Sequence, residues 1–212
     1  MSPIVSLEGR TVVVTGAGQG IGKAVVETVV ALGGNAVAVD LNGAALEAAV
    51  AALPAERMLA VSANVTDPAR AGQAVADAVA RFGAVHGLVN NAGIIRPAMI
   101  EKMTDEQWQA VIDVHLTGSF YWTRAVGQHM LARAKAGDRS GGSIVNISSD
   151  AGRKGSIGQI NYAAAKAGLM AMSMTIAREW GRHNIRANSV CFGVVETPMT
   201  EVIRGEKFRD GM

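Results

Sequence analysis

The sequence of 212 residues has little cysteine, few aromatic residues and almost no excess of either charge. Cys191 is the only cysteine, which excludes an intrachain disulfide and a cysteine-based metal site, and we expect it to be a small buried side chain. Aromatic residues make up 4%, which argues against a stacking surface for single-stranded nucleic acid. The formal net charge is +2 with scattered lysines and arginines, so neither a nucleic acid nor an acidic membrane surface is indicated as a partner.

Long apolar runs are also missing. No run approaches the roughly 18 residues that a membrane span needs, and the first ten residues lack the basic and apolar regions of a signal peptide. We therefore expect a cytoplasmic protein without a membrane-bound part. Apolar residues make up 49% of the chain and there are 25 glycines, a composition that favours one globular domain over residues 1–212 with many tight turns.

Short apolar stretches alternate regularly with helical patterns along the chain. The expected strands are Thr11–Thr15, Asn35–Asp40, Met58–Ala63, His86–Asn90, Ser143–Ile147 and Ile185–Phe192. The expected helices cover 20–32, 44–53, 67–82, 104–134 and a last segment that ends near Trp180. Such alternation predicts an α/β fold of the Rossmann type, a doubly wound parallel sheet with helices on both faces.

A glycine-rich turn joins the first strand to the first helix, with the spacing G-x-x-x-G-x-G from Gly16 to Gly22. Glycines allow backbone N–H groups to approach a pyrophosphate, and the helix N-terminus is attractive to its negative charge. By itself, the pattern is also compatible with an ordinary strand-to-helix turn.

Two further segments favour a dinucleotide. Asp40 ends the second strand 18 residues after Gly22 (40 − 22), close to the spacing of about 20 for an acid that binds a ribose diol. A carboxylate there repels a 2′-phosphate, which favours NAD over NADP. The alternative for Asp40 is a helix N-cap. Asn90–Gly93 follows the fourth strand at the same edge of the sheet, although asparagine and glycine also suit a plain turn.

Tyr162 and Lys166 lie four residues apart on the last helix, so their side chains project from one face. A neighbouring ammonium favours the phenolate and is expected to lower the pKa of Tyr162. Ser149, expected in a polar turn after the fifth strand, is placed to hydrogen-bond a substrate oxygen. Together these groups suit proton transfer to or from an alcohol or carbonyl oxygen, although Y-x-x-x-K alone also occurs in ordinary helices.

Taken together, these segments resemble the short-chain dehydrogenase/reductase family, with the closest similarity to its 3-oxoacyl-[acyl-carrier-protein] reductase-like branch. The matching segments are TGAGQGIG (Thr15–Gly22), NNAG (Asn90–Gly93), Ser149, the Tyr162 and Lys166 pair, and NSVCFGVVETPM (Asn188–Met199). The resemblance spans nearly the whole chain and implies hydride transfer between a nicotinamide and a secondary alcohol or ketone.

The resemblance also implies roles for individual residues. Tyr162 is the expected acid/base, Lys166 its modulator and a ligand of the nicotinamide ribose, and Ser149 the group that orients the substrate. The cofactor-binding residues that it implies, besides Tyr162 and Lys166, are Gly16, Gln19, Gly20, Ile21, Asp40, Asn64, Val65, Asn91, Ala92, Gly93, Val195 and Thr197.

Three positions depart from the family pattern. His115 stands where the family has a fourth catalytic residue, an asparagine, so it is either a proton relay or a packing residue. Asn64 replaces an aspartate beside the adenine, and Phe192 replaces a proline before Gly193.

The resemblance further implies a homo-oligomer, tetramer or dimer, and a further helix and strand beyond Met212. A small-molecule alcohol or ketone is the expected partner. Two alternatives stay open: an NADP-dependent reductase of the same family, and a non-catalytic dinucleotide-binding sensor or scaffold.

Overall fold

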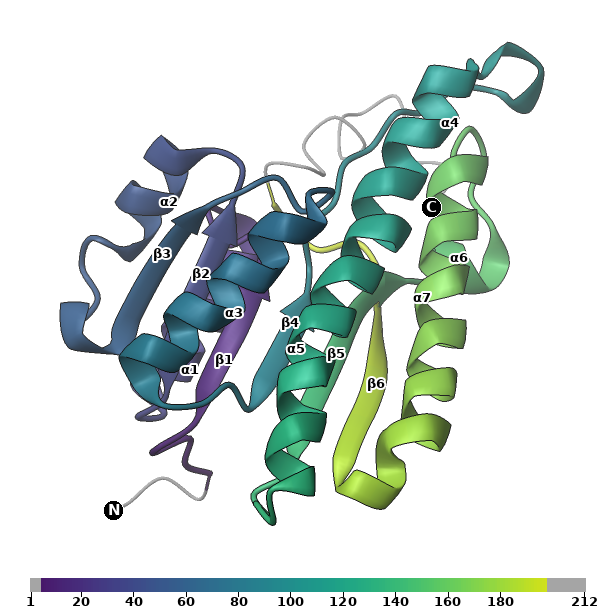
Figure 1. Cartoon of the computed structure of the whole chain (residues 1–212). Coiled ribbons are helices and arrows are strands. Elements are labelled where there is room, and N and C mark those ends of the chain that lie inside the picture. Colours follow the sequence, from purple (N-terminus) through teal and green to yellow (C-terminus); the bar gives the residue numbers. More distant parts are fainter. Residues whose placement is uncertain (1–4, 198–212) are drawn as a thin grey trace.

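The computed structural model describes residues 5–197, which form a six-stranded sheet between two layers of helices (Figure 1). Neighbouring strands are parallel throughout, in the order β3-β2-β1-β4-β5-β6. The strands are β1 (Thr11–Thr15), β2 (Asn35–Asp40), β3 (Met58–Ser62), β4 (Gly87–Asn90), β5 (Gly142–Ser149) and β6 (Ile185–Phe192). The predicted doubly wound parallel sheet is confirmed, and the strand order reverses between β1 and β4, where ligands bind in such sheets.

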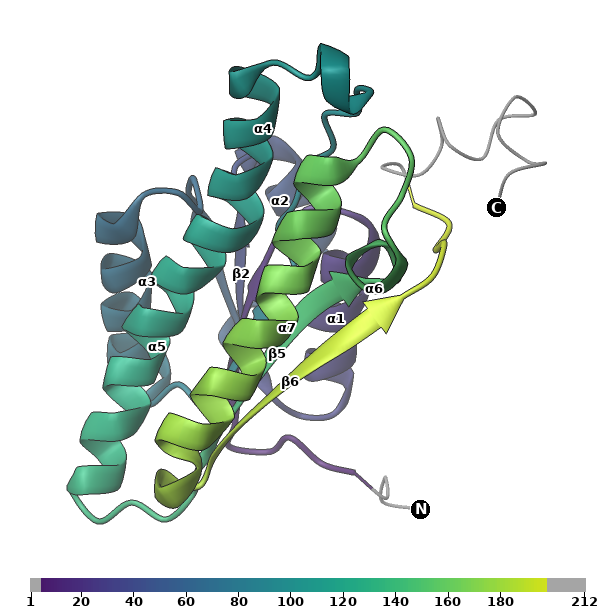
Figure 2. The same ribbon diagram turned by 90° about the vertical axis from the view of Figure 1, so that its right-hand side faces the viewer.

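Helices cover both faces of the sheet, as a parallel sheet buried on both sides requires (Figure 2). The main helices are α1 (Gly20–Ala31), α2 (Gly43–Val50), α3 (Pro68–Phe82), α4 (Asp105–Ile112), α5 (Gly118–Lys135) and α7 (Ile160–Trp180). The short elements are η1 (Ala55–Arg57), η2 (Ile100–Lys102), η3 (Asp113–Thr117), α6 (Ala151–Lys154) and η4 (Gly181–His183). None of the helices in the described part of the chain is long and apolar enough to cross a membrane.

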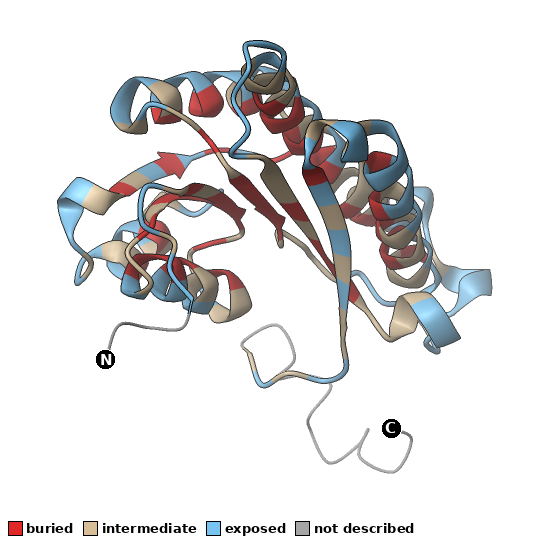
Figure 3. Cartoon of the chain, turned by 90° about the horizontal axis from the view of Figure 1, so that it is seen from below, coloured by how far each residue is buried: buried red, intermediate tan, exposed pale blue. Residues whose placement is uncertain are grey.

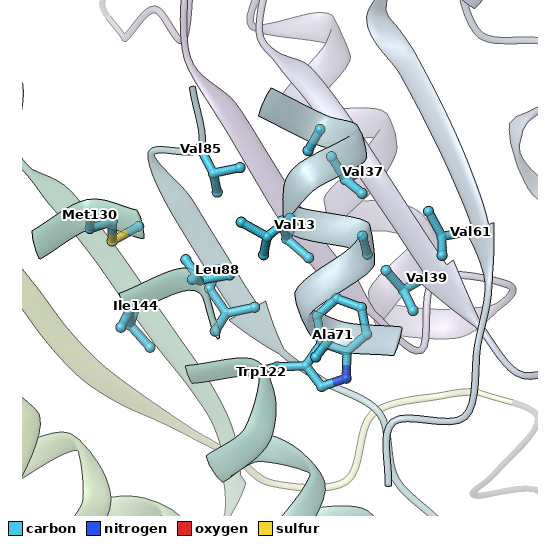
Figure 4. Close-up of a cluster of buried hydrophobic side chains, with 14 of the residues drawn as sticks. Val13, Val37, Val39, Val61, Ala71, Val85, Leu88, Trp122, Met130 and Ile144 are labelled. Carbon is cyan, nitrogen blue, oxygen red and sulfur yellow. The ribbon is translucent and has the colours of Figure 1, made fainter. Parts of the chain in front are cut away.

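Two apolar clusters hold these layers together. One lies between the sheet and α3, α5 and α7, and Figure 4 shows Trp122 from α5 beside Ala71 of α3. The other joins α1 and α2 to the opposite face of the sheet. Val13 points into the first cluster and Val14 into the second, as the alternation along a strand dictates. Burying each such side chain contributes roughly 1.5–3 kcal/mol.

The buried residues follow the middle strands, and the exposed ones lie mainly on the outer helix faces and along β6 (Figure 3). β1, for example, is buried at four of its five positions, whereas β6 is fully buried only at Ile185. The central strands are therefore the rigid platform from whose ends the polar site residues project.

Two helix starts follow the sequence closely. The side chain of Asp67 accepts hydrogen bonds from Ala69 N and Arg70 N at the start of α3, with Pro68 in the first helical position. Thr104 and Gln107 form the predicted reciprocal capping box at the start of α4.

The prediction of a single helix over 104–134 is wrong in one respect, because the π-helical turn η3 separates α4 from α5. Gly118 N–H bonds to Asp113 O, a wider turn that adds one residue to the helix. A Cβ on Gly118 would lie 3.0 Å from Val65 Cγ2, so glycine lets the helix pass close to the segment after β3. Such wide turns are frequent at functional sites.

The boundaries of β5 also differ from the prediction. Ser148 and Ser149 were expected in a turn, but both belong to β5 and pair with Cys191 and Phe192 of β6. The ladder therefore continues two residues further and fixes Ser149 on a rigid element. Met199 and Pro198, the last residues of the matching C-terminal segment, lie outside the described residues.

Candidate active site

A single cleft opens over the carboxyl ends of the strands and collects every predicted site residue. Its predicted members are Gly16, Gln19, Gly20, Ile21, Asp40, Asn64, Val65, Asn91, Ala92, Gly93, His115, Ser149, Tyr162, Lys166, Val195 and Thr197. The sequence analysis missed apolar wall residues of the cleft, among them Leu41, Ile94 and Ile147. No chemical motif marks these positions, and their nearness to Asp40, Gly93 and Ser149 in the sequence was the one available signal.

The glycine turn is shaped as a close-approach site for a ligand. Gly16 has a φ of +67°, and a Cβ there would lie 2.8 Å from Ala92 Cα. A Cβ on Gly22 would lie 2.0 Å from Gly16 O, so the turn and the first turn of α1 pack backbone to backbone. This cradle at a helix N-terminus fits a pyrophosphate, since it offers backbone N–H groups and the positive end of the helix dipole.

Asn91 fastens the cradle to the end of β4. Its Nδ2 donates to Thr15 O at 3.0 Å and to Gly16 O at 3.1 Å. The Thr15 hydroxyl in turn accepts from the backbone N–H groups of Asn91 and Ala92. Asn90–Gly93 is therefore more than the plain turn that was its alternative, because the amide group of Asn91 holds the glycine turn in place.

Asp40 lies at the end of β2 with its carboxylate beside the glycine turn. Gly18 N donates to Oδ2 and Asn42 N donates to Oδ1, both at 2.9 Å. The N-cap of α2 is Asn42, which accepts from Ala45 N, so the alternative role of Asp40 as a helix cap is wrong. Each carboxylate oxygen keeps a second lone pair, which suits the two neighbouring hydroxyls of a ribose.

The predicted adenine side is formed by the segment after β3. Val65 is buried, and Asn64 Oδ1 accepts from Thr66 N at 3.1 Å. This bond orders the backbone beside the cleft without a formal charge, as expected for asparagine in place of the family's aspartate.

The end of β5 and the first turns of α7 bring Ser149, Tyr162 and Lys166 to the same side of the cleft. Lys166 is 4% exposed, and its Nζ donates to Ile147 O at 2.6 Å. Ser148 Oγ donates to Lys166 O at 2.7 Å, which fixes α7 against β5. The three predicted catalytic side chains therefore meet at one edge of the sheet.

The predicted lowering of the Tyr162 pKa is not found in this geometry. Burial raises the pKa of Tyr162, and the hydrogen bond with Ser149 partly offsets that rise. Burial also lowers the pKa of Lys166 to about 8. For the phenol, the loss of hydration outweighs the hydrogen bond with Ser149, and the Lys166 ammonium is bonded to the carbonyl of Ile147.

His115 sits on η3 beneath this group, 1% exposed. Its ring meets the Tyr162 ring edge-on with the centroids 5.2 Å apart, and its Nε2 lies 3.0 Å from Ile94 N and 2.8 Å from Ile94 O. Its Nδ1 is buried and has no hydrogen-bond partner among residues 5–197. Burial, with a smaller contribution from the Lys166 charge, lowers the pKa of His115 to about 3, so the imidazole is neutral at pH 7.

Comparisons with known proteins agree with this site. Residues 10–207 match the model of the family described as "short chain dehydrogenase". The chain is 41% identical over 207 residues to the 3-oxoacyl-[acyl-carrier-protein] reductase FabG of Thermotoga maritima, covering 96% of this chain and 81% of that protein. It is 39% identical over 220 residues to the (3R)-3-hydroxyacyl-CoA dehydrogenase of Mus musculus, covering 99% and 83% of the two chains.

A similar solved structure is the 3-ketoacyl-(acyl-carrier-protein) reductase from Brucella melitensis complexed with NADH. It superimposes with a TM-score of 0.90 at 29% identity and covers 97% of this chain and 83% of that one. The glycine turn, the Asp40 carboxylate and the Ser149, Tyr162 and Lys166 side chains line one cleft, in agreement with these relatives. The chain is therefore an oxidoreductase with a nicotinamide dinucleotide site, and it belongs to the short-chain dehydrogenase/reductase family.

Proposed function

We propose that the protein is an NAD(H)-dependent oxidoreductase that interconverts 3-oxoacyl thioesters and the corresponding 3-hydroxyacyl thioesters. The observation that carries the proposal is that Tyr162, Lys166 and Ser149 line the same cleft as the glycine turn and Asp40. The substrate class is proposed from the activities after which the acyl-carrier-protein and CoA relatives are named.

The proposed mechanism assigns one proton transfer to the chain itself. When bound, the nicotinamide supplies a hydride to the carbonyl carbon. Tyr162 donates its phenolic proton to the carbonyl oxygen, and Ser149 donates a hydrogen bond to the same oxygen. The ammonium of Lys166, 5.4 Å from the centroid of the tyrosine ring, stabilises the phenolate that remains. In the reverse direction the phenolate takes the alcohol proton.

Because burial raises the pKa of Tyr162 above its ordinary value, the phenol is protonated at pH 7, as a proton donor must be before the reaction. His115 is proposed to act as a neutral hydrogen-bonding group that holds Ile94, since an imidazole with a pKa of about 3 takes up no proton at pH 7. We therefore favour a packing role for His115 over a proton relay, which would need the imidazole to take up a proton.

Asp40 is the basis for proposing NAD rather than NADP. Its carboxylate lies 2.9 Å from Gly18 N, at the edge of the cradle where the adenosine ribose is expected. A 2′-phosphate there would face the carboxylate charge.

The proposal is tested with NADH and NADPH against a panel of 3-oxoacyl thioesters, cyclic ketones and diketones. We expect turnover of thioesters with NADH, and a loss of about 10²–10⁴-fold in kcat for Tyr162→Phe. The dissociation constant of NADH should stay within a few-fold, because the phenyl ring keeps the edge contact with His115. Full turnover by Tyr162→Phe would refute the acid/base assignment, and NADH binding without turnover of any substrate would favour the sensor alternative.

We also propose a homo-oligomer that associates through a groove between α5 and α7. The groove is lined by Phe120, Arg124, Met172, Glu179 and Trp180, among others. Phe120 is 46% exposed, and the opposite charges of Arg124 and Glu179 suit a self-complementary contact. Light scattering should show that Phe120→Asp dissociates the oligomer, whereas Ile157→Asp, a change at a side chain 90% exposed elsewhere, leaves it intact.

A further inference from the structure

Asn161, the residue before Tyr162, is fully buried and holds three separate parts of the chain. Its Nδ2 donates to Arg96 O and to Gln107 O, each at 3.0 Å. Its Oδ1 accepts from Tyr162 N at 2.8 Å. A buried amide is costly unless its hydrogen bonds are made. The three hydrogen bonds of the buried Asn161 therefore indicate that an amide side chain is specifically required at this position.

The first part held by Asn161 is the segment of residues 91–98, of which residues 91–94 line one wall of the cleft. Ile94 of this segment lines the cleft and is bonded to His115 Nε2. Two residues further on, Arg96 O receives the amide of Asn161, and Ala98 N then donates to Gly158 O at 2.9 Å. The wall is therefore anchored to the tyrosine-bearing side of the cleft at successive points.

The second part is α4. This helix begins with its own capping box, in which the side chain of Gln107 is already bonded to Thr104 N. The backbone carbonyl of Gln107 is the atom that Asn161 reaches. One side chain thus joins the wall segment, the first turns of α4 and the start of α7.

We propose that Asn161 is a positioning residue that sets the distance between the wall at Ile94 and the phenol of Tyr162, and thereby the seating of the substrate carbonyl. This inference rests on the proposed function, in which Tyr162 is the proton donor. Asn161 itself does not line the cleft, so its effect reaches the substrate through the backbone of Arg96 and Tyr162. The cradle around Gly16 is held by Asn91 instead, and dinucleotide binding should not depend on Asn161.

The test uses the full chain with Asn161→Asp, which keeps the shape of the side chain and removes both donated bonds. We expect kcat/KM for the thioester to fall by at least about tenfold at pH 8, because carboxylate oxygens would face two carbonyl oxygens. The dissociation constant of NADH should stay within about twofold. At pH 6 the ratio of variant to wild-type kcat/KM should recover, since a protonated carboxyl group can donate one bond.

Two controls separate positioning from general destabilisation. Asn161→Ala has no titrating group and should show the loss without recovery at low pH. Asn146→Asp disturbs another buried amide, which donates to Ser173 Oγ at 2.8 Å, away from the wall. If Asn161 were only a stability residue, both aspartate variants would lower the melting temperature and share the same pH profile of activity.

Hydrogen exchange supplies a readout that does not need turnover. In Asn161→Asp, the amides of Ile94 and Ala98 should exchange at least about tenfold faster, whereas the amide of Ala17 in the glycine turn should not change. Unchanged exchange at Ile94 and Ala98 would overturn the anchoring of the wall by Asn161, and faster exchange with unchanged kcat/KM would overturn the positioning role of Asn161. If the wild-type chain reduces no thioester, the proposed function fails, and with it the positioning role. The exchange data would then still decide whether Asn161 anchors the wall.

Discussion

The Nζ atom of Lys166 lies 5.4 Å from the centroid of the Tyr162 ring and donates a hydrogen bond of 2.6 Å to Ile147 O. The backbone of β5 thus holds the ammonium near the phenol ring. Of the described residues that line the cleft, Lys166 alone carries a formal positive charge. No other formally positive side chain among these lining residues is therefore available to the phenol or to a ribose hydroxyl.

The hydrogen bond between Ser149 and Tyr162 should set the pH profile of alcohol oxidation. That bond favours the phenolate and lowers the pKa of Tyr162 against the rise caused by burial. In Ser149→Ala we expect the rise of kcat/KM with pH to move to higher pH, because the phenolate forms less readily. Initial rates of oxidation between pH 7 and 11 measure the midpoint. A midpoint that stays in place or moves to lower pH would contradict the assigned bond.

The carboxylate of Asp40 should govern the choice between the two dinucleotides. In Asp40→Asn, the side-chain oxygen can still accept from the backbone N–H of Gly18 or Asn42, but the charge is gone. We expect the ratio of kcat/KM with NADPH to that with NADH to rise by at least about tenfold, because the repulsion of a 2′-phosphate disappears. Asn64→Ala serves as a control on the adenine side and should not change this ratio.

Two histidines at the opposite edge of the sheet should make the fold acid-sensitive. His86 Nδ1 accepts from Thr11 N at 3.2 Å, and His129 Nε2 accepts from Val85 N at 3.1 Å. Burial and nearby arginines lower the pKa of His86 to about 4, and burial also lowers the pKa of His129. The unfolded chain takes up the proton first, near the ordinary value of 6.5, so the free energy of unfolding should fall as the pH drops from 6.5 to about 4.

The urea midpoint at several pH values measures this effect. In His86→Asn an amide oxygen replaces the ring nitrogen as acceptor and does not titrate, so the midpoint should fall less between pH 6.5 and 4 than in the wild type. His183→Asn, on η4, should leave the pH dependence as it is. Part of the acid dependence should persist in His86→Asn, because the pKa values of His115 and His129 are also lowered. A dependence as steep as that of the wild type would contradict the contribution of His86.

Two glycines in helices should respond in opposite ways to alanine. A Cβ on Gly127 of α5 would lie 2.2 Å from Cη2 of Trp180, so Gly127→Ala should destabilise the fold by about 1–3 kcal/mol. A Cβ on Gly72 of α3 would meet nothing within 4 Å, so Gly72→Ala should stabilise it by about 0.5–1 kcal/mol. Thermal unfolding distinguishes the two, and a stable Gly127→Ala would show that Trp180 moves aside freely.

The sequence predicted the sheet and the membership of the cleft well, because both depend on local patterns. Runs such as Thr11–Thr15 contain consecutive buried valines, and the polar residues that follow such runs mark the carboxyl ends of strands. The parallel arrangement then brings those ends to one edge. For this reason Asp40, Asn91 and Ser149, far apart in sequence, could be placed together in advance.

What the sequence did not predict depends on tertiary contacts. The wide turn at Asp113–Thr117 has no sequence signature, since Gly118 alone suggests flexibility rather than an added residue. The pKa of Tyr162 depends on burial and on where the Lys166 ammonium bonds, and neither follows from their spacing of four residues. Asn161 was passed over because an asparagine at the start of a helix is ordinary until its partners are known.

The loops that contain Ala98 and Gly158, between the cleft wall at Ile94 and the start of α7, are joined by a hydrogen bond from Ala98 N to Gly158 O. They carry exposed apolar side chains, namely Met99 at 48%, Ile100 at 68% and Ile157 at 90%. The cradle, by contrast, is built from backbone contacts at Gly16 and Gly22 that tolerate no added atom. Variation in the chain can therefore alter which molecules are admitted while the hydride chemistry beneath stays the same. A protein of this kind can acquire a new substrate specificity through substitutions in these loops alone.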